Sequence, residues 1–202
     1  MRVMLYDQTC MGQDGRLPLS AAWRAGDGLY QGLGWLDAAR GVDTWRDGLA
    51  WLADQSPDEP IEEIQFWGHG KWGCALIDGQ PLSLQSLSRR SPLRAPLEAV
   101  RARTAPAVRW WFRTCETVGA SAGQDFARGW SDFFGGPVTG HTYIIGFWQS
   151  GLRTIRPGCE PDYAASEGLK EGTPAAPLRA FTSAPWRPRT VSCLNARVPK
   201  RW

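Results

Sequence analysis

Short apolar runs alternate with amphipathic segments along most of the chain, an order that few architectures accommodate. The apolar runs predict strands at 2–6, 61–67, 107–112 and 138–142. The amphipathic segments predict helices at 19–33, 43–54, 93–103 and 121–134. Strands that alternate with helices favour a parallel sheet with helices on both faces. The sequence therefore predicts an α/β fold, a three-layer sandwich with a mainly parallel sheet.

The periodic pattern fades from about residue 158, which suggests a boundary. We expect an α/β domain over 1–157 and a Pro-rich, basic extension over 158–202 that packs on the domain or trails from it. Such a basic tail either holds an acidic partner or is a solvated end. Just before it, the segment 143–153 either extends the sheet or forms a flap over its edge.

Composition limits the class of protein. A net charge of +3 gives no indication of a nucleic acid or a membrane surface as partner. The apolar start of the chain reaches Asp7 too early for a secretory signal. The five cysteines are odd in number, widely spaced and without a CxxC pair, which favours reduced thiols. We therefore expect a cytoplasmic protein without a metal site or cofactor.

The residues that follow the predicted strands carry the chemistry. Parallel strands end at one edge of a sheet, where loops leave a crevice for ligands. The strand ends at 68–70, 113–115 and 140–142 bring together His69, Arg113, Cys115 and His141, and the first strand ends at 7–9. A nearby imidazole and a helix N-terminus lower the pKa of a cysteine thiol, and the thiolate is the nucleophile. Cys115 is thus a candidate nucleophile and His69 its candidate base.

Glycine follows the histidine in the stretch Gly68-His69-Gly70. A residue without Cβ lets the backbone approach a bound carbonyl closely. The amides of Gly70 and Cys115 are therefore candidate donors of an oxyanion hole. The non-catalytic alternatives are a turn histidine at position 69 and a packed core thiol at position 115.

A strand that ends in His69-Gly70 and a later strand that ends in Cys115 resemble the caspase-like fold of cysteine peptidases, which includes gingipains, clostripain, separase and CHAT domains. In that family the histidine and cysteine form a dyad on adjacent strands, and the glycine after the histidine binds the oxyanion. The resemblance covers roughly residues 1–150. It implies a His69/Cys115 dyad with Gly70 as oxyanion donor. The segment Arg-Thr-Cys-Glu-Thr-Val-Gly is closer to CHAT domains than to caspases.

The resemblance also implies where a substrate would bind. The residue two positions before the cysteine lines the specificity pocket in that family, and here it is Arg113. Arginine there favours an acidic side chain or a free carboxylate. Arg24 resembles the arginine that caspases place in the same pocket. Trp67 and Trp148 are candidate pocket walls, and His141 is a rival base, a substrate contact or a capping residue.

Two functions from different classes follow. The first is a cysteine hydrolase, most simply a peptidase acting on a peptide or protein substrate through the His69/Cys115 dyad, with an acidic substrate group near Arg113. The second is a non-catalytic scaffold of the same fold that binds an anionic ligand or peptide at this edge. A third reading, carbohydrate recognition, depends only on the twelve tryptophans. The sequence leaves the oligomeric state open.

Overall fold

The computed structural model describes residues 1–12 and 18–200 of the 202-residue chain. Four α-helices lie in this part of the chain: α1 (Leu19–Gly32), α2 (Trp45–Ala53), α3 (Arg94–Arg101) and α4 (Ala120–Phe134). A 3₁₀ helix covers Leu84–Leu87. The strands are β1 (Arg2–Asp7), β2 (Ala38–Val42), β3 (Ile61–Trp67), β4 (His69–Lys71), β5 (Cys74–Ile77), β6 (Gln80–Ser83), β7 (Thr104–Arg113), β8 (Val138–His141), β9 (Trp148–Gln149), β10 (Leu152–Ile155), β11 (Leu169–Gly172), β12 (Pro177–Ala180) and β13 (Val191–Ser192).

A six-stranded sheet in the order β10-β8-β7-β3-β1-β2 forms the centre of the fold. The pairs β1–β2, β1–β3, β3–β7 and β7–β8 are parallel. Only the edge strand β10 of this sheet is antiparallel to its neighbour, β8. The predicted α/β class and the mainly parallel sheet are therefore confirmed.

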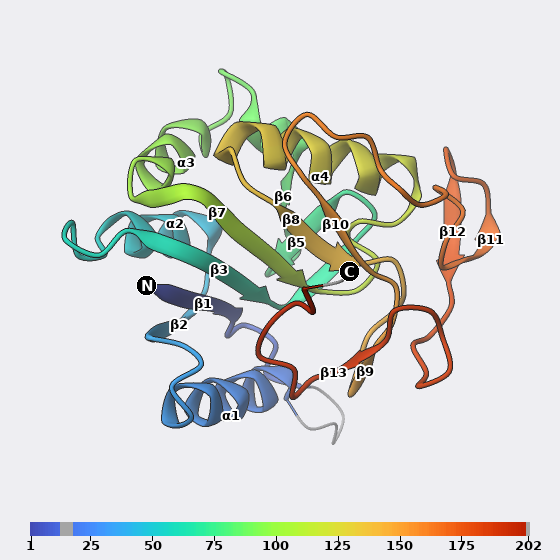
Figure 1. Ribbon diagram of the computed structural model, residues 1–202, viewed down its shortest axis with the longest axis horizontal. Coiled ribbons are helices and arrows are strands. Elements are labelled where there is room, and N and C mark those ends of the chain that lie inside the picture. Colours follow the sequence, from blue (N-terminus) through green and yellow to red (C-terminus); the bar gives the residue numbers. More distant parts are fainter. Residues whose placement is uncertain (13–17, 201–202) are drawn as a thin grey trace.

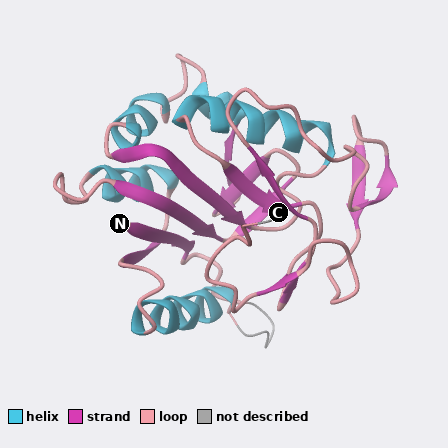
Figure 2. Ribbon diagram, in the orientation of Figure 1, coloured by secondary structure: helices cyan, strands magenta, loops and turns pink. Residues whose placement is uncertain are grey.

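Helices cover both faces of this sheet. Helix α1 lies on one face, and α2, α3 and α4 lie on the other (Figures 1 and 2). Successive side chains of a strand point to opposite faces of the sheet, so each strand contributes side chains to both helix layers. On β7, Trp110 and Phe112 pack against Trp130 of α4, while Trp111 lies in a separate cluster with Leu152.

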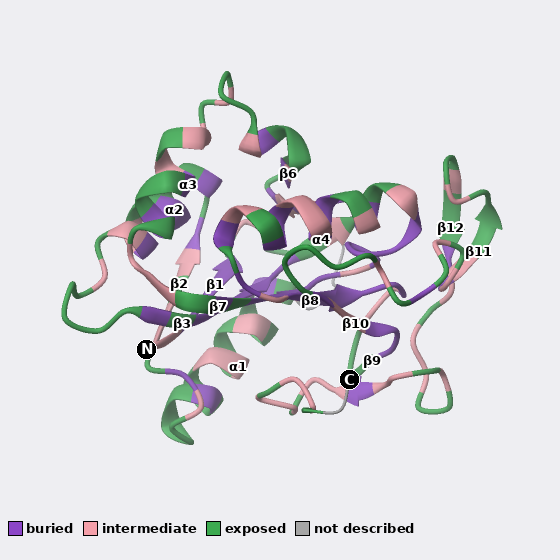
Figure 3. Cartoon of the chain, turned by 45° about the horizontal axis from the view of Figure 1, so that its top comes forward, coloured by how far each residue is buried: buried purple, intermediate pink, exposed green. Residues whose placement is uncertain are grey.

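The larger core lies between the sheet and helices α2 to α4 (Figure 3). Its largest side chains are aromatic, and the Trp110 ring meets that of Trp130 edge-on at 5.3 Å. The smaller core lies beneath α1, where Tyr30 meets the ring of Trp67 at 5.2 Å. Offset and edge-on aromatic pairs of this kind contribute about 0.5–1.5 kcal/mol each beyond area burial. Much of the tryptophan content is therefore core.

Local capping explains where α2 begins and where α4 ends. The Thr44 hydroxyl accepts a 3.1 Å hydrogen bond from the Asp47 amide and so caps α2. The expected start at Asp43 is thus one residue early, and that side chain instead accepts a hydrogen bond from Gln8. Helix α4 ends at Phe134 and is followed by Gly135, whose φ of 69° is the left-handed conformation that glycine adopts most readily.

Several elements differ from the predicted order. Strand β2 follows α1 and forms an edge of the sheet, although its sequence, AARGV, shows little alternation. The segment after β3 folds into a separate three-stranded sheet of β4, β5 and β6. Of the segment 143–153, only Leu152 and Arg153 join the main sheet, as the start of β10. Strand β9 in the same segment pairs with β13 in a separate two-stranded sheet.

The region after residue 157 packs against the rest of the chain within the described residues. The Tyr163 hydroxyl donates to the Val118 carbonyl at 2.7 Å, and Arg153 pairs with Glu167. Strand β13 pairs with β9. Of the predicted basic tail, residues 201 and 202 lie outside the described part of the chain.

Candidate functional site

Two neighbouring parallel strands bring His69 and Cys115 to the same edge of the sheet. Strand β3 pairs with β7 so that Trp67 lies opposite Arg113. His69 and Cys115 each follow these paired residues by two positions. Both strands run in the same direction, so the two side chains emerge from the same carboxyl edge, where ligands bind in open parallel sheets.

A cavity of about 430 Å³ lies at this edge, and His69 and Cys115 both line it. We call it the Cys115 cavity. Its walls come from the ends of β3 and β7, most of the length of α1, the 145–149 segment and residues 193–194. The lining residues are Leu19, Ala22, Trp23, Gly26, Leu29, Tyr30, Trp67, Gly68, His69, Arg113, Cys115, Ile145, Gly146, Phe147, Gln149, Cys193 and Leu194.

Gly70 lies directly against the turn that carries Cys115. A Cβ at this position would stand 2.7 Å from Cβ of Thr114 and 2.9 Å from the carbonyl oxygen of Cys115. No side chain fits there without a shift of the neighbouring turn. The absence of Cβ therefore lets the β4 backbone approach the Cys115 turn closely. Gly70 itself is not among the residues that line the Cys115 cavity, and its role as oxyanion donor stays a prediction.

The turn after Cys115 is strained. Glu116 has a φ of 43° and Ala120 a φ of 57°, and side-chain-bearing residues adopt this left-handed region at a cost. The Glu116 amide donates to the Tyr143 carbonyl at 3.0 Å, which ties the turn to the segment after β8. Backbone strain of this kind clusters at functional sites.

Cys115 is half-buried, and its Sγ lies 3.9 Å from the carbonyl oxygen of Ile145. Burial raises the pKa of the Cys115 thiol, and the carboxylate of Glu116 raises it further. Glu116 is itself buried, and its Oε2 has no hydrogen-bond partner among the described residues. Burial also raises the pKa of this carboxyl. Both effects on the thiol disfavour the thiolate form of Cys115.

His69 is exposed, and its ring contacts a different cysteine. Its Nε2 lies 3.3 Å from Sγ of Cys10, and Trp23 meets the ring edge-on at 5.8 Å. Cys10 follows β1, the strand beside β3, so it reaches the same edge of the sheet. The sequence pattern indicated Cys115 as candidate nucleophile and not Cys10. The position of Cys10 just after a strand end was the available signal.

Arg113 is buried, and all three guanidinium nitrogens donate within the chain. Nε and Nη2 both donate to Oε1 of Gln149, at 3.2 and 3.1 Å. Nη1 donates to the Tyr30 hydroxyl at 2.8 Å and to the Asn195 carbonyl at 3.0 Å. Nη2 also donates to the Cys193 carbonyl at 2.9 Å. Arg113 lines the cavity, but in this structure it has no donor left for a substrate carboxylate.

Aromatic rings complete the surroundings of this guanidinium. Its Cζ lies 4.3 Å from the ring centres of both Trp67 and Trp111. Such cation–π contacts stabilise a buried arginine. Burial lowers the pKa of the Arg113 guanidinium, with the Tyr30 hydroxyl acting in the opposite sense. The arginine thus holds the C-terminal residues against the sheet.

His141 is completely buried on β8 and does not line the Cys115 cavity. Its Nδ1 lies 3.1 Å from the carbonyl of Ser150, and the Trp111 indole donates to its Nε2 at 3.4 Å. These partners require the neutral ring with the proton on Nδ1. Burial lowers the pKa of His141 from 6.5 to about 3. The structure therefore gives this histidine a packed position away from the cavity.

The remaining candidates lie in different places. Trp67 is buried and lines the Cys115 cavity. Trp148 is exposed, and its ring meets that of Phe147, which is a cavity residue, at 5.1 Å. Arg24 is exposed on α1 and lines a separate hollow near Tyr6, away from Arg113.

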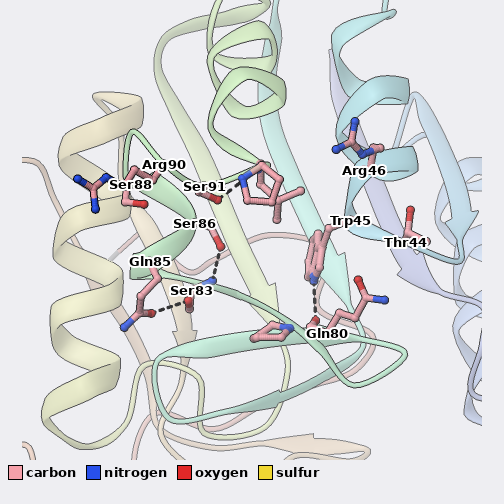
Figure 4. Close-up of a pocket in the computed structure, with 13 residues that line it drawn as sticks. Thr44, Trp45, Arg46, Gln80, Ser83, Gln85, Ser86, Ser88, Arg90 and Ser91 are labelled. Atoms are coloured by element: carbon pink, nitrogen blue, oxygen red, sulfur yellow. Dashed lines mark hydrogen bonds between the residues drawn. The ribbon is translucent and has the colours of Figure 1, made fainter.

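A second hollow, rich in serine, lies between α2, β6 and the segment before α3 (Figure 4). Its volume is about 640 Å³. Its polar groups bond to one another: the Ser83 amide donates to the Ser86 hydroxyl, and the Trp45 indole donates to the Gln80 carbonyl. No cysteine or histidine lines it, so thiol chemistry points to the Cys115 cavity instead.

Within residues 1–12 and 18–200, no group of three or more His, Cys, Asp and Glu side chains is arranged to hold a metal ion. Among the helices of the described residues, none combines the length and hydrophobicity of a membrane span.

Comparison with known proteins yields no matching family model, curated protein or solved structure.

Proposed function

We propose that the protein is a cysteine hydrolase with a caspase-like fold, in which Cys115 is the nucleophile and His69 the general base. The observation that carries the proposal is the position of both side chains in one cavity, at the carboxyl ends of the adjacent parallel strands β3 and β7. The resemblance to caspase-like peptidases requires this adjacency of the two strands. An amide of a peptide or protein is the simplest substrate.

The reaction would proceed through a thioester. The Cys115 thiolate attacks the amide carbonyl after its proton passes to His69, and the amides of Gly70 and Cys115 bind the oxyanion. The C–N bond then breaks, and the imidazolium gives its proton to the leaving amine. Water, deprotonated by His69, hydrolyses the thioester, releases a carboxylic acid and restores the thiol.

The contact between His69 and Cys10 bears on this mechanism. The ring must turn from Cys10 toward Cys115 to form the dyad, and catalytic hydrogen bonds often tighten only when substrate binds. Cys10 is thus a rival thiol. A bound substrate that expels water from the cavity and approaches Cys115 would favour the orientation in which the His69 ring faces Cys115.

The second candidate is a non-catalytic scaffold that binds a ligand at the same edge. The raised pKa of the Cys115 thiol favours it, because a protonated thiol is a weak nucleophile. A scaffold needs neither a reactive cysteine nor a mobile histidine.

The deciding experiment is alkylation of the native protein with dilute iodoacetamide between about pH 5 and 9, with modified sites identified by mass spectrometry. We expect Cys115 to react with an apparent pKa that rises in His69→Ala and is retained in Cys10→Ser. A His69-dependent pKa at Cys10 instead would make Cys10 the nucleophile. Equal, slow labelling of Cys115 in all three proteins would favour the scaffold.

A further inference from the structure

The Cys115 cavity is mainly apolar. The side chains of α1 contribute one wall, the 145–147 segment a second, and Leu194 a third. The apolar lining side chains are Leu19, Ala22, Trp23, Leu29, Trp67, Ile145, Phe147 and Leu194. No acid and no lysine lines the cavity. Its volume of about 430 Å³ is in the usual range for small-ligand sites, which are mostly apolar with a few polar groups.

Several large apolar side chains remain exposed at the mouth of this cavity. Leu19 is 45% exposed, Leu29 44%, Phe147 56% and Leu194 50%. Apolar side chains that are exposed singly need no explanation, but a group around one opening marks a binding site. This opening also contains the thiol and imidazole of the proposed dyad, so the group it receives lies beside the reacting bond.

Arg113 is the one charged residue of the lining, and its hydrogen-bond donors all bind acceptors within the chain. Arg113 donates to Gln149, Tyr30 and the carbonyls of Cys193 and Asn195. A substrate carboxylate in the cavity would lose water without gaining a free donor from Arg113, which costs free energy. An apolar group loses only unfavourable contacts with water.

We propose that the Cys115 cavity is the specificity pocket and that it receives a bulky aliphatic or aromatic side chain of the substrate, on the acyl side of the cut bond. This inference rests on the hydrolase function proposed above, and it replaces the acidic group that the position of Arg113 alone suggests. Arg113 is then a positioning residue. It holds the carbonyls on either side of Leu194, and this places Leu194 in the pocket wall.

The first test is hydrolysis of a series of acetyl-peptide aminocoumarin amides that differ only in the residue before the cut: Leu, Phe, Asp or Arg. We expect kcat/KM for the Leu or Phe substrate to exceed that for Asp by about tenfold or more, as pocket discrimination of side chains allows. Leu29→Glu, which places a carboxylate at the mouth, should lower kcat/KM for the apolar substrates by about tenfold. Leu33→Glu is the matched control, because Leu33 is 51% exposed and lies outside the cavity.

The second test measures binding without catalysis. Acetyl-phenylalanine amide and acetyl-aspartate amide are titrated into Cys115→Ser, with tryptophan fluorescence as readout because Trp23 and Trp67 line the cavity. We expect the phenylalanine compound to bind more tightly, and Leu29→Glu to weaken that binding.

The two tests separate the two proposals. Selective binding of the apolar compound without any hydrolysis would support the pocket and reject the hydrolase. Hydrolysis that is fastest for the Asp or Arg substrate would support the hydrolase and reject the apolar pocket. The absence of both hydrolysis and selective binding would reject both.

Discussion

Glu116 is the charged residue that follows Cys115 directly in the chain. Its carboxylate raises the pKa of the Cys115 thiol, in addition to the larger effect of burial. Glu116→Gln removes the negative charge and keeps the shape of the side chain. We therefore expect the pKa of Cys115 to fall in this variant and alkylation near neutral pH to become faster. The measurement is the pH dependence of iodoacetamide labelling at Cys115.

The exposed carboxylate of Glu62 on β3 offers a matched control for that change. Glu62→Gln alters the net charge by the same amount away from the thiol. Equal labelling profiles in Glu116→Gln and the wild-type protein would show that the Glu116 carboxyl carries no charge beside Cys115.

His141 makes stability depend on pH. Its pKa is about 3 in the folded protein and 6.5 ordinarily, because burial disfavours the charged ring. The nearby Arg113 guanidinium lowers the pKa further. The unfolded chain therefore binds the proton more readily than the folded one. The contribution of the neutral ring is complete above about pH 6.5 and is lost as the pH falls toward 3.

We expect the free energy of unfolding to fall by about 1.4 kcal/mol per pH unit in this window because of His141 alone. In His141→Asn, which keeps a donor toward the Ser150 carbonyl, the fall should be shallower. Urea unfolding at pH 7, 6, 5 and 4 measures both slopes. Parallel slopes in the two proteins would mean that His141 is not held neutral.

At the scale of elements, the contact between β4 and the Cys115 turn is the tightest feature of the site. Gly70→Ala would place a Cβ 2.9 Å from the Cys115 carbonyl oxygen and 2.7 Å from Thr114. We expect this variant to lose about 1–3 kcal/mol of stability, since overpacking forces the neighbouring backbone to move. The melting temperature and the rate of Cys115 labelling should both change.

Gly28 of α1 is the control for that substitution. A Cβ added at Gly28 would have no heavy atom within 4 Å apart from its chain neighbours and the backbone of its own helix. The residue lies inside α1. Gly28→Ala should therefore stabilise the protein by up to about 1 kcal/mol. A destabilising effect there, or a neutral Gly70→Ala, would contradict the packing that the structure shows.

At the scale of the whole molecule, residues 190–198 form a strap over the sheet face that carries α1. The strap supplies acceptors to three buried side chains: the Cys193 and Asn195 carbonyls bind Arg113 and Tyr30, and the Ala196 carbonyl binds Gln65. Val191 and Val198 also pack in the cluster of Trp111. The carbonyls of the strap thus offset part of the free-energy cost of burying the Arg113 guanidinium.

Removal of the strap should destabilise the whole protein. A chain that ends at Arg189 leaves Arg113 with fewer acceptors, and loss of the partners of a buried charge costs about 3–5 kcal/mol. We expect its melting temperature to fall well below that of a control that lacks only residues 199–202. Differential scanning calorimetry measures both. Equal melting temperatures would show that the strap contributes no stability.

The positions of most helices and of the central strands could be predicted from the sequence, because local periodicity and capping residues determine them. The run AVRWWF predicted the central strand, and Phe126, Trp130 and Gly135 predicted α4 and its end. Strand β2 was missed because an edge strand with the sequence AARGV carries little alternation. The location of His69 and Cys115 at one edge followed from the order of strands.

The sequence by itself determined the α/β layering, since this depends on periodic patterns within a few residues. It also predicted a cysteine and a histidine at one edge, because each follows a predicted strand of a parallel sheet. Only the tertiary structure decided the state of each side chain there. Arg113 is closed off by a strap that lies about 80 positions later in the chain. His141 is buried by Trp111, and His69 contacts Cys10. These outcomes depend on packing between distant segments, which local patterns do not record.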